Sequence, residues 1–176
     1  IDIADRIRTS DFAALKSADG PVKPYDAGPG LGTDHIWFNL NTSRKEGSGS
    51  DGQPSDGKVI QMDNTPKYKW FSSKNFRRAV AFAVDRGSIA ANQLQGLATP
   101  LYGFVPAGNK TWLDPNLPKK EYSLDQSRTL LQQAGFVQRD NGGKPELFDA
   151  EGNRVEFTLI VPSEDEPRKL LRPTGI

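Results

Sequence analysis

Two helical patterns follow each other between residues 75 and 95, and they constrain the fold more than any other feature of the sequence. In the first pattern, apolar residues recur at i, i+4, i+7 and i+8, which places them on one face of a helix. These residues are Phe76, Val80, Ala83 and Val84. Phe82 projects from a different side, so we expect this helix to be covered on more than one face.

Asp85 separates the two patterns and can cap a second helix that begins near Ser88. We expect Ile89 and Leu94 to turn inward on this helix. Gly96 suits its C-terminal end, because glycine accepts a left-handed conformation without a Cβ penalty.

A long loop is predicted after the paired helices, over residues 96–122. Its four prolines rule out a continuous helix or a central strand. They are Pro100, Pro106, Pro115 and Pro118. The whole chain of 176 residues contains 17 glycines and 13 prolines, and only 35% of it is hydrophobic. This composition favours a loop-rich α/β or mixed α+β domain over a helical bundle.

Three further helices are predicted. Residues 11–17 could form a short helix capped by Ser10 or Asp11. A capping box runs from Ser123 to Gln126 and opens a helix that Gly135 closes. The apolar residues of this helix are Leu124, Leu130 and Leu131. The same spacing from Ser163 to Glu166 opens a last helix, which Pro173 ends.

Alternation of side chains predicts strands in two places. In residues 35–41 an apolar residue stands at every second position, which is typical of a strand. Residues 146–161 predict a hairpin around the turn 150–153. Its second strand would carry Val155, Phe157, Leu159 and Val161. Residues 42–58 contain no apolar residue and are rich in Gly, Ser and Asp. This composition predicts a flexible surface insertion.

Charge and cysteine content exclude several classes of function. The formal net charge is +1, with 23 basic and 22 acidic residues spread along the chain, so nucleic acid is not an expected partner. No apolar stretch is long enough to span a membrane, and the first residues lack the layout of a signal peptide. The absence of cysteine excludes disulfides, thiolate chemistry and cysteine-ligated zinc.

Motifs that suggest chemistry have simpler explanations. The segment GPGLG, residues 28–32, lacks the preceding strand and following helix of a phosphate loop and is interpreted as a turn. His35 is the single histidine and is expected to be structural. Residues 149–153 alternate oxygen ligands but lack the glycine position and distal glutamate of a calcium loop. No metal site and no cofactor are expected.

Pairs of carboxylates are the remaining candidates for catalysis. Asp149 with Glu151 lies in the predicted turn, and Glu164 with Glu166 lies at a predicted helix N-terminus. Turn chemistry and the helix dipole explain both pairs without catalysis. No catalytic residue is therefore assigned.

Aromatic residues on or beside loops are the best candidates for ligand binding. Such residues can line a cleft for a peptide or a sugar, with asparagine side chains supplying hydrogen bonds. The alternative is that each aromatic residue packs in the core. The candidate ligand-binding residues are Trp37, Asn39, Asn41, Tyr102, Phe104 and Trp112.

Four segments in this order resemble the family 5 extracellular solute-binding proteins, the dipeptide- and oligopeptide-binding receptors of ABC importers. The segments are GPGLGTDHIWFNLN, FRRAVAFAVDRGSIAANQLQGLATP, YSLDQSRTLLQQAGF and FTLIVPSEDEPRKLL. The first resembles a Gly-Pro turn leading into a strand that ends Phe-Asn. The second resembles the family signature of a helix, then Asp-Arg, then a Gly-x-Ala turn. The third and fourth are similar to the helix that ends Ala-Gly-Phe and to a strand feeding a further helix.

The resemblance implies an α/β (mixed α+β) fold, part of a periplasmic-binding-protein type II fold with a mixed sheet flanked by helices. Residues 1–41 would be the end of the first lobe and a hinge strand, and residues 42–60 a Gly/Ser-rich insertion. Residues 61–176 would be the N-terminal part of the third domain, truncated relative to the family. The leader is expected to lie outside this chain.

The function implied is that of a substrate-binding component of an ABC transporter, which imports peptides or similar solutes and is not an enzyme. The implied partners are a peptide or other small solute and the membrane permease, and the implied location is periplasmic or lipid-anchored outside the cytoplasm. A carbohydrate- or metal-chelate-binding receptor of the same fold is an alternative. A carboxylate-dependent hydrolase domain and a non-binding scaffold are alternatives of other classes. Exposed sheet edges of such a fragment could also drive dimerisation.

Overall fold

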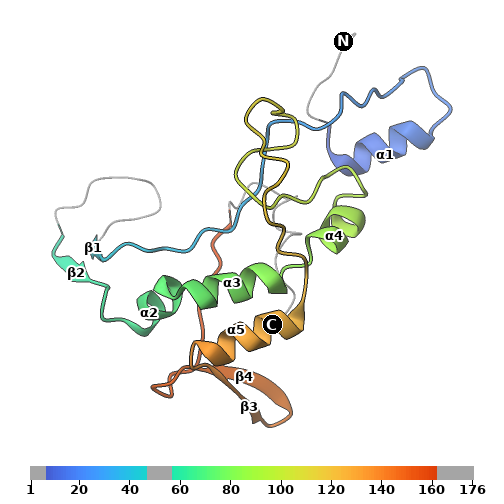
Figure 1. Cartoon of the computed structure of the whole chain (residues 1–176). Coiled ribbons are helices and arrows are strands. Elements are labelled where there is room, and N and C mark those ends of the chain that lie inside the picture. The colour runs from blue at the N-terminus through green and yellow to red at the C-terminus, as the bar shows by residue number, and fades with distance from the viewer. Residues whose placement is uncertain (1–6, 47–56, 162–176) are drawn as a thin grey trace. The chain divides into compact units, whose positions relative to one another are not determined.

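The computed structural model describes residues 7–46 and 57–161. Its elements in chain order are α1 (Thr9–Ser17), β1 (Ser43–Lys45), β2 (Val59–Gln61), α2 (Pro66–Ser72), α3 (Lys74–Ala83), α4 (Arg86–Ser88), a π-helix (Ile89–Gln93), α5 (Leu124–Gln133), β3 (Val137–Asn141) and β4 (Lys144–Phe148). Figure 1 shows these helices and strands along the chain. The mixed α/β content predicted from the sequence is confirmed.

The strands pair as two separate antiparallel ribbons rather than as one mixed sheet. Strand β1 pairs with β2, with Arg44 opposite Ile60. Strand β3 pairs with β4, with Arg139 opposite Glu146. Gly142 and Gly143 form the turn of this second ribbon with φ angles of 63° and 84°, which only glycine adopts readily.

The chain divides into two compact units that are not continuous in sequence. The described residues of the first unit are 7–34, 85–121 and 160–161, and the second unit comprises His35–Val84 and Tyr122–Leu159. This division differs from the linear segments 1–41, 42–60 and 61–176 expected from the sequence. The assignment of those segments to lobes of a receptor remains a prediction.

The second unit contains an aromatic core built on three elements. Trp70 from α2, Phe76 from α3 and Phe136 after α5 are its buried members. The ring of Phe76 lies 5.2 Å from that of Phe136, between centroids, and Phe71 lies 5.4 Å from Phe157. Such tilted and edge-on arrangements stabilise aromatic clusters beyond the area that they bury.

Helices α3 and α5 pack against each other in the second unit, as Figure 1 shows. Ala79 of α3 is completely buried and Leu130 of α5 is almost so. The Ser123 N–H donates to the Phe82 carbonyl at 2.9 Å and joins the start of α5 to α3. The expectation that the first helix is covered on more than one face is confirmed, because α2 and the aromatic core contact it as well.

Most predicted helix ends are found where the sequence places them. Ser123 accepts from the Gln126 N–H at 3.3 Å, and Gly135 ends the helix with φ 82°. Asp85 accepts from the Ser88 N–H at 2.9 Å, so it caps the second helix as predicted. That helix begins at Arg86 and continues as a π-helix from Ile89.

Gly96 also has the predicted left-handed conformation, with φ 75°, and its N–H donates to the Ala90 carbonyl at 2.8 Å. Ile89 and Leu94 are both half-buried. As predicted, residues 96–122 contain no helix and no strand.

The predicted cap of α1 is wrong. Ser10 and Asp11 lie inside the helix, and Arg8 precedes it without a side-chain cap. The Asp11 carboxylate pairs instead with the Arg8 guanidinium, at 2.8 Å from Nε to Oδ2. The ion pair therefore uses the group that was expected to cap the backbone.

Two predicted strands are also wrong. Residues 35–41 form no strand, because the described strands pair only within the two ribbons. The predicted hairpin over residues 146–161 reduces to one bridge between Phe148 and Arg154, beside which the Val155 N–H donates to the Leu147 carbonyl at 2.7 Å. The strand partner of β4 along its whole length is β3. Phe157 packs on the ring of Phe71 rather than continuing a ladder.

Part of the predicted insertion is ordered. Ser43–Lys45 forms β1, and the Glu46 N–H donates to the Lys58 carbonyl at 2.9 Å. Residues 47–56, and the helix predicted after Ser163, lie outside the described residues. Within the described part of the chain, no helix is both long and apolar enough to cross a membrane.

Candidate ligand-binding site

The loop after the π-helix is built from consecutive turns in the first unit. The Asn109 N–H donates to the Pro106 carbonyl at 2.9 Å, and the Leu113 N–H donates to the Asn109 carbonyl at 3.1 Å. Asn116 continues the series, because its N–H donates to Asp114 Oδ1 at 2.9 Å. These bonds satisfy the backbone where prolines prevent regular structure.

This loop presents two large aromatic side chains to solvent. Phe104 is 71% exposed and Trp112 is 75% exposed. Exposed aromatic rings offer apolar area and a stacking surface to a ligand. Both residues were candidates from the sequence, and neither packs in the core formed by the described residues.

The backbone of Pro29 and Gly30 lies close to the loop at Gly108. A Cβ atom at Gly108 would overlap the Pro29 carbonyl oxygen and lie 2.9 Å from that of Gly30. Only glycine therefore fits at position 108 without movement of the backbone. The GPGLG segment, residues 28–32, is a turn as predicted, in which the Gly28 N–H donates to Asp26 Oδ1 at 2.8 Å.

Tyr102, the third candidate in this unit, is half-buried among charged side chains. The Arg86 guanidinium carbon lies 5.6 Å from the centre of its ring, within the range of a cation–π interaction. Burial raises the pKa of the Tyr102 hydroxyl, and the charge and hydrogen bonding of Glu121 raise it further. Tyr102 is therefore a neutral hydrogen-bond donor at neutral pH.

The other three candidates belong to the second unit, so neither unit contains all six. Trp37 is 71% exposed, and its ring centroid lies 5.4 Å from that of His35. Asn39 Oδ1 accepts from the Asn41 N–H at 3.0 Å, which forms a local turn. Both asparagines are exposed, so the Asn41 side chain is accessible to solvent.

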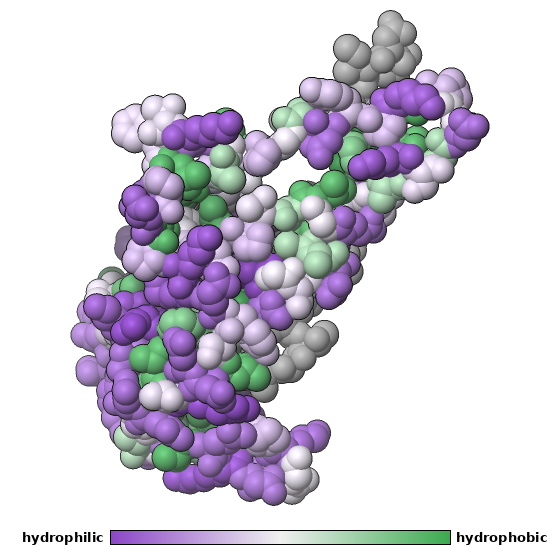
Figure 2. All heavy atoms as spheres, turned by 45° about the vertical axis from the view of Figure 1, so that its right-hand side comes forward, coloured by the Kyte–Doolittle hydropathy of each residue, from purple (hydrophilic) through white to green (hydrophobic). Residues whose placement is uncertain are grey.

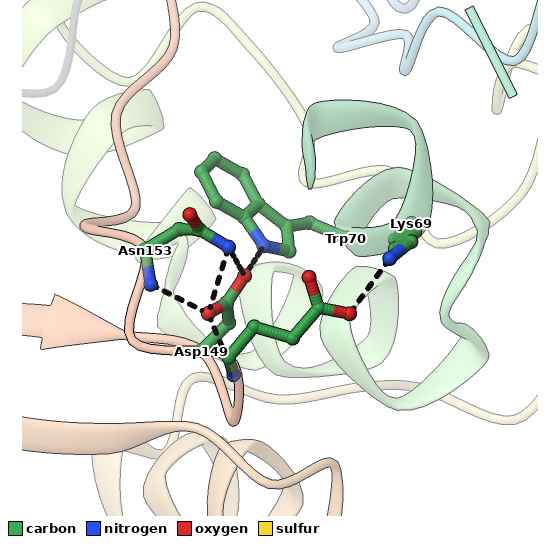
Figure 3. Close-up of polar contacts among 5 residues, drawn as sticks. Lys69, Trp70, Asp149 and Asn153 are labelled. Atoms are coloured by element: carbon green, nitrogen blue, oxygen red, sulfur yellow. Dashed lines mark hydrogen bonds and ion pairs between the residues drawn. The ribbon is translucent and has the colours of Figure 1, made fainter. Parts of the chain in front are cut away.

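A buried carboxylate lies elsewhere in the second unit, at the turn between β4 and Arg154. Figure 3 shows Asp149 surrounded by donors. Its carboxylate accepts from Trp70 Nε1 at 2.8 Å, from the Glu151 N–H at 3.0 Å and from the Asn153 N–H at 2.8 Å. The Asn153 side-chain amide donates to both carboxylate oxygens, at 3.0 and 3.3 Å.

These bonds determine the charge state of Asp149. Burial alone would raise the pKa of its carboxyl group, but the hydrogen bonds from Asn153 and Trp70 hold the pKa below its usual range. Glu151 is bound to Lys69, at 2.6 Å from Oε1 to Nζ. A general acid needs a raised pKa, and a base or nucleophile needs free lone pairs, so the Asp149–Glu151 pair is structural.

A shallow groove between α3 and α5 was not predicted from the sequence. Its volume is about 320 Å³. Its lining combines an apolar floor with polar side chains, and consists of Arg78, Phe82, Asp125, Gln126, Thr129, Leu130 and Gln133. The polar residues Asp125, Thr129 and Gln133 repeat at i and i+4 on α5, but only the packing of α3 on α5 places Arg78 beside them.

The described residues offer no metal site, because no three of their His, Asp or Glu side chains cluster closely enough to hold an ion. The surface offers no broad apolar area in the view of Figure 2, where hydrophobic residues form small separate groups among hydrophilic ones. Single exposed aromatic side chains are therefore the most distinctive feature of the candidate site.

Comparison with known proteins agrees with the four segments quoted above. A family profile described as bacterial extracellular solute-binding proteins, family 5 Middle, matches residues 1–172. A probable ABC transporter-binding protein of Deinococcus radiodurans is 33% identical over 117 residues, which are 65% of this chain and 19% of that protein. No solved structure matches the chain.

Two other relatives have similar coverage. Oligopeptide-binding protein AppA of Bacillus subtilis is 30% identical over 106 residues, 58% of this chain and 19% of that protein. Protein XP55 of Streptomyces lividans is 30% identical over 93 residues, 53% of this chain and 16% of that protein. The matches thus span about a fifth of the length of these relatives. Because the family profile covers almost the entire chain, this protein belongs to the bacterial extracellular solute-binding proteins of family 5.

Proposed function

We propose that this chain is part of the substrate-binding component of an ABC transporter and takes part in binding peptides for import. The observation that carries the proposal is the family match over residues 1–172. The name of the Bacillus subtilis relative supports a peptide as the ligand. Such a receptor closes two lobes around its ligand by hinge motion and delivers it to a membrane permease. No bond of the solute is made or broken, so the protein is not an enzyme.

The exposed aromatic residues suit this role. Phe104 and Trp112 can stack on side chains of a peptide, and the amide of Asn41 can bond to its main chain. Contacts to the main chain bind peptides of varied sequence, because every residue has the same backbone groups. The location consistent with the family is outside the cytoplasmic membrane, either in the periplasm or at a lipid anchor.

A carbohydrate- or metal-chelate-binding receptor of the same family is the alternative. Exposed aromatic rings also stack on sugars, so Trp112 does not by itself discriminate between peptides and carbohydrates. The hydrolase alternative has little support, because Asp149 is held by Trp70 and Asn153 and Glu151 by Lys69.

Thermal unfolding with ligand pools tests the proposal. The chain is melted alone and with dipeptides, with longer peptides and with oligosaccharides. A peptide at 100 times its Kd stabilises the folded state by about 2.7 kcal/mol, and so raises Tm. Trp112→Ala should reduce this shift, whereas Tyr25→Ala should not, because Tyr25 is an exposed aromatic residue outside the candidate site. A shift with oligosaccharides alone would favour the carbohydrate receptor, and no shift with any pool would contradict binding by this chain.

A further inference from the structure

The turn between β3 and β4 contains the single asparagine of the chain that is followed by glycine. Asn141 is the last residue of β3, and Gly142 and Gly143 are the two residues of the turn. Every other asparagine is followed by a residue with a side chain. Because glycine has no Cβ, nothing on residue 142 hinders the approach of the Asn141 side chain to the Gly142 nitrogen.

We propose that Asn141 is a modification site, at which deamidation converts the side-chain amide to a carboxylate through a cyclic imide. The Gly142 nitrogen loses its proton to hydroxide from the solvent and forms a bond to Asn141 Cγ. The bond from Cγ to Nδ2 then breaks, and the leaving nitrogen takes a proton from water and departs as ammonia. Water opens the imide at either carbonyl, which leaves aspartate or isoaspartate at position 141. This reaction needs no solute and is independent of the function proposed above.

The attacking nitrogen is accessible in the structure. The Gly143 N–H donates to Asp140 Oδ1 at 2.9 Å, whereas the Gly142 N–H makes no hydrogen bond within the described residues. The ladder ends at the pair of Asn141 and Lys144, so it does not use the Gly142 N–H either. A Cβ atom at either glycine would meet no atom within 4 Å, so the turn is open to water.

The place of Asn141 at the end of the ribbon gives its backbone the freedom that ring closure requires. The imide forms only when the backbone at Asn141 rotates out of the extended conformation, which brings the Gly142 nitrogen to Cγ. All five residues of β3 are exposed, and Asn141 belongs to the last pair of the ladder. Exposed ends of elements open locally at little cost in free energy. The reaction therefore starts from the opened end of the ribbon.

A hydrogen bond to Glu146 restrains the Asn141 side chain while the ribbon is closed. Asn141 Nδ2 donates to Glu146 Oε2 at 3.1 Å, and Glu146 Oε1 accepts from Arg154 Nη1 at 2.8 Å. Glu146 lies opposite Arg139, so this bond draws the amide back along β3 and away from the turn. The charge of Glu146 also disfavours a deprotonated nitrogen nearby. Both effects slow the reaction.

Modification should open the ribbon at the turn. A carboxylate at position 141 would face Glu146 in place of a donor, and like charges on neighbouring strands repel. Isoaspartate also adds one carbon atom to the main chain, so the register of Asn141 with Lys144 cannot be kept.

Incubation of the chain at mildly alkaline pH, followed by peptide mapping with mass spectrometry, tests the site. The peptide containing Asn141 should gain the mass difference between an amide and an acid and separate into an aspartate and an isoaspartate product. Asn41 and Asn116 are internal controls, because both are exposed and are followed by larger residues. They should react at least about tenfold more slowly, a difference in barrier of about 1.4 kcal/mol.

Asn141→Gln is the matched variant, because glutamine must close a larger ring, and it should abolish the reaction at this position. No product at Asn141, or equal rates at Asn141, Asn41 and Asn116, would overturn the proposal.

Variants of Glu146 test the restraint separately. Glu146→Ala should raise the rate about threefold, the equivalent of a hydrogen bond of about 0.7 kcal/mol. Glu156→Ala is the control and should leave the rate unchanged, because Glu156 binds Arg154 but not Asn141. If Glu146→Ala does not fold, Glu146→Gln decides, because it keeps the length of the side chain and removes the charge, and it should also raise the rate. A rate that is unchanged or lower would overturn the role of Glu146.

Amide hydrogen exchange tests the effect on the ribbon. Ion-exchange chromatography separates the modified chain by its additional negative charge. Residues 137–148 should exchange faster in the isoaspartate fraction than in the unmodified chain. Asn141→Asp adds the charge without the additional carbon atom and should exchange at an intermediate rate. Equal exchange in all three proteins would overturn the opening of the ribbon.

Discussion

At the scale of single residues, Asp149 shows how one side chain joins two distant parts of the second unit. Its exposed fraction is 8%, and it lies 79 positions along the chain from Trp70, whose indole N–H it accepts at 2.8 Å. The same carboxylate closes its own turn through Asn153 and Glu151. A single carboxylate thus satisfies a buried indole and the backbone of the turn together.

Asp149→Asn should lower the free energy of unfolding by about 1–3 kcal/mol, because the amide cannot accept from Trp70 and from the turn equally well. Urea unfolding at neutral pH measures this difference. Glu151→Gln is the matched control in the same turn, since it breaks the exposed ion pair with Lys69 and should cost less than about 1 kcal/mol. Equal losses in both variants would contradict a special role for the buried carboxylate.

The difference in stability between the wild type and Asp149→Asn should depend on pH. The pKa of Asp149 is lower in the folded state than its ordinary value of about 3.9. The ionised carboxylate therefore stabilises the fold fully above about pH 4, and this contribution is lost as the pH falls through the folded pKa. The difference in stability between the wild type and Asp149→Asn should shrink in acid. A difference that stays constant down to pH 2 would be evidence against this assignment.

At the scale of elements, the packing of α3 on α5 depends on a small residue. Ala79 is completely buried in α3, and its neighbour along the face, Phe76, is 2% exposed. The Cβ of an alanine lets the two helices approach closely, and a larger side chain would force them apart.

Ala79→Leu should destabilise the chain by about 1–3 kcal/mol, because three additional carbon atoms have no space in this contact. Thermal and urea unfolding measure the loss. Ala14→Leu serves as the control, because Ala14 is exposed on α1 and the change there should stay within about 0.5 kcal/mol. A tolerated leucine at position 79 would show that α3 and α5 can move apart freely.

At the scale of the whole molecule, the chain passes repeatedly between the two units. The unit boundaries follow residues 34, 84, 121 and 159, so neither unit is one continuous segment. Because each unit combines segments that are distant in the sequence, its boundaries cannot be predicted from local composition.

Dimerisation through a sheet edge is the prediction at this scale. All five residues of β3 are exposed, and within the described residues this strand pairs only with β4. An open edge can pair with a second chain, so sedimentation velocity should show association that grows with concentration. Val137→Lys places a charge on β3 and should shift the equilibrium to monomer, whereas Val22→Lys, outside both ribbons, should not. A single monomeric species at every concentration would rule out this association.

Local interactions explain which parts of the fold were predictable. Asp85 and Ser123 cap helices through bonds to residues three positions away, and Gly96 and Gly135 end them with positive φ angles. Each of these features involves only one helical turn, so the necessary information is contiguous in the sequence. The turn formed by Gly28 in the GPGLG segment belongs to the same class.

The candidate site was predictable only in part. The aromatic residues of the loop could be identified because prolines exclude regular structure around them, and Phe104 and Trp112 are indeed exposed. The sequence placed Trp37 in the same group, although it lies in the other unit. The groove between α3 and α5 was missed, because it combines side chains from two separate helices.

The sequence by itself determined the helix ends, the course of the proline-rich loop and membership of the family, since these depend on short contiguous patterns. Tertiary structure decided the strand pairing, in which β4 pairs along its length with β3 and makes only a single bridge to Arg154. It also decided the burial of Ala79 and the bond from Trp70 to Asp149. These features depend on which distant segments meet, and the free energy of such contacts is a property of the packed chain rather than of any local stretch.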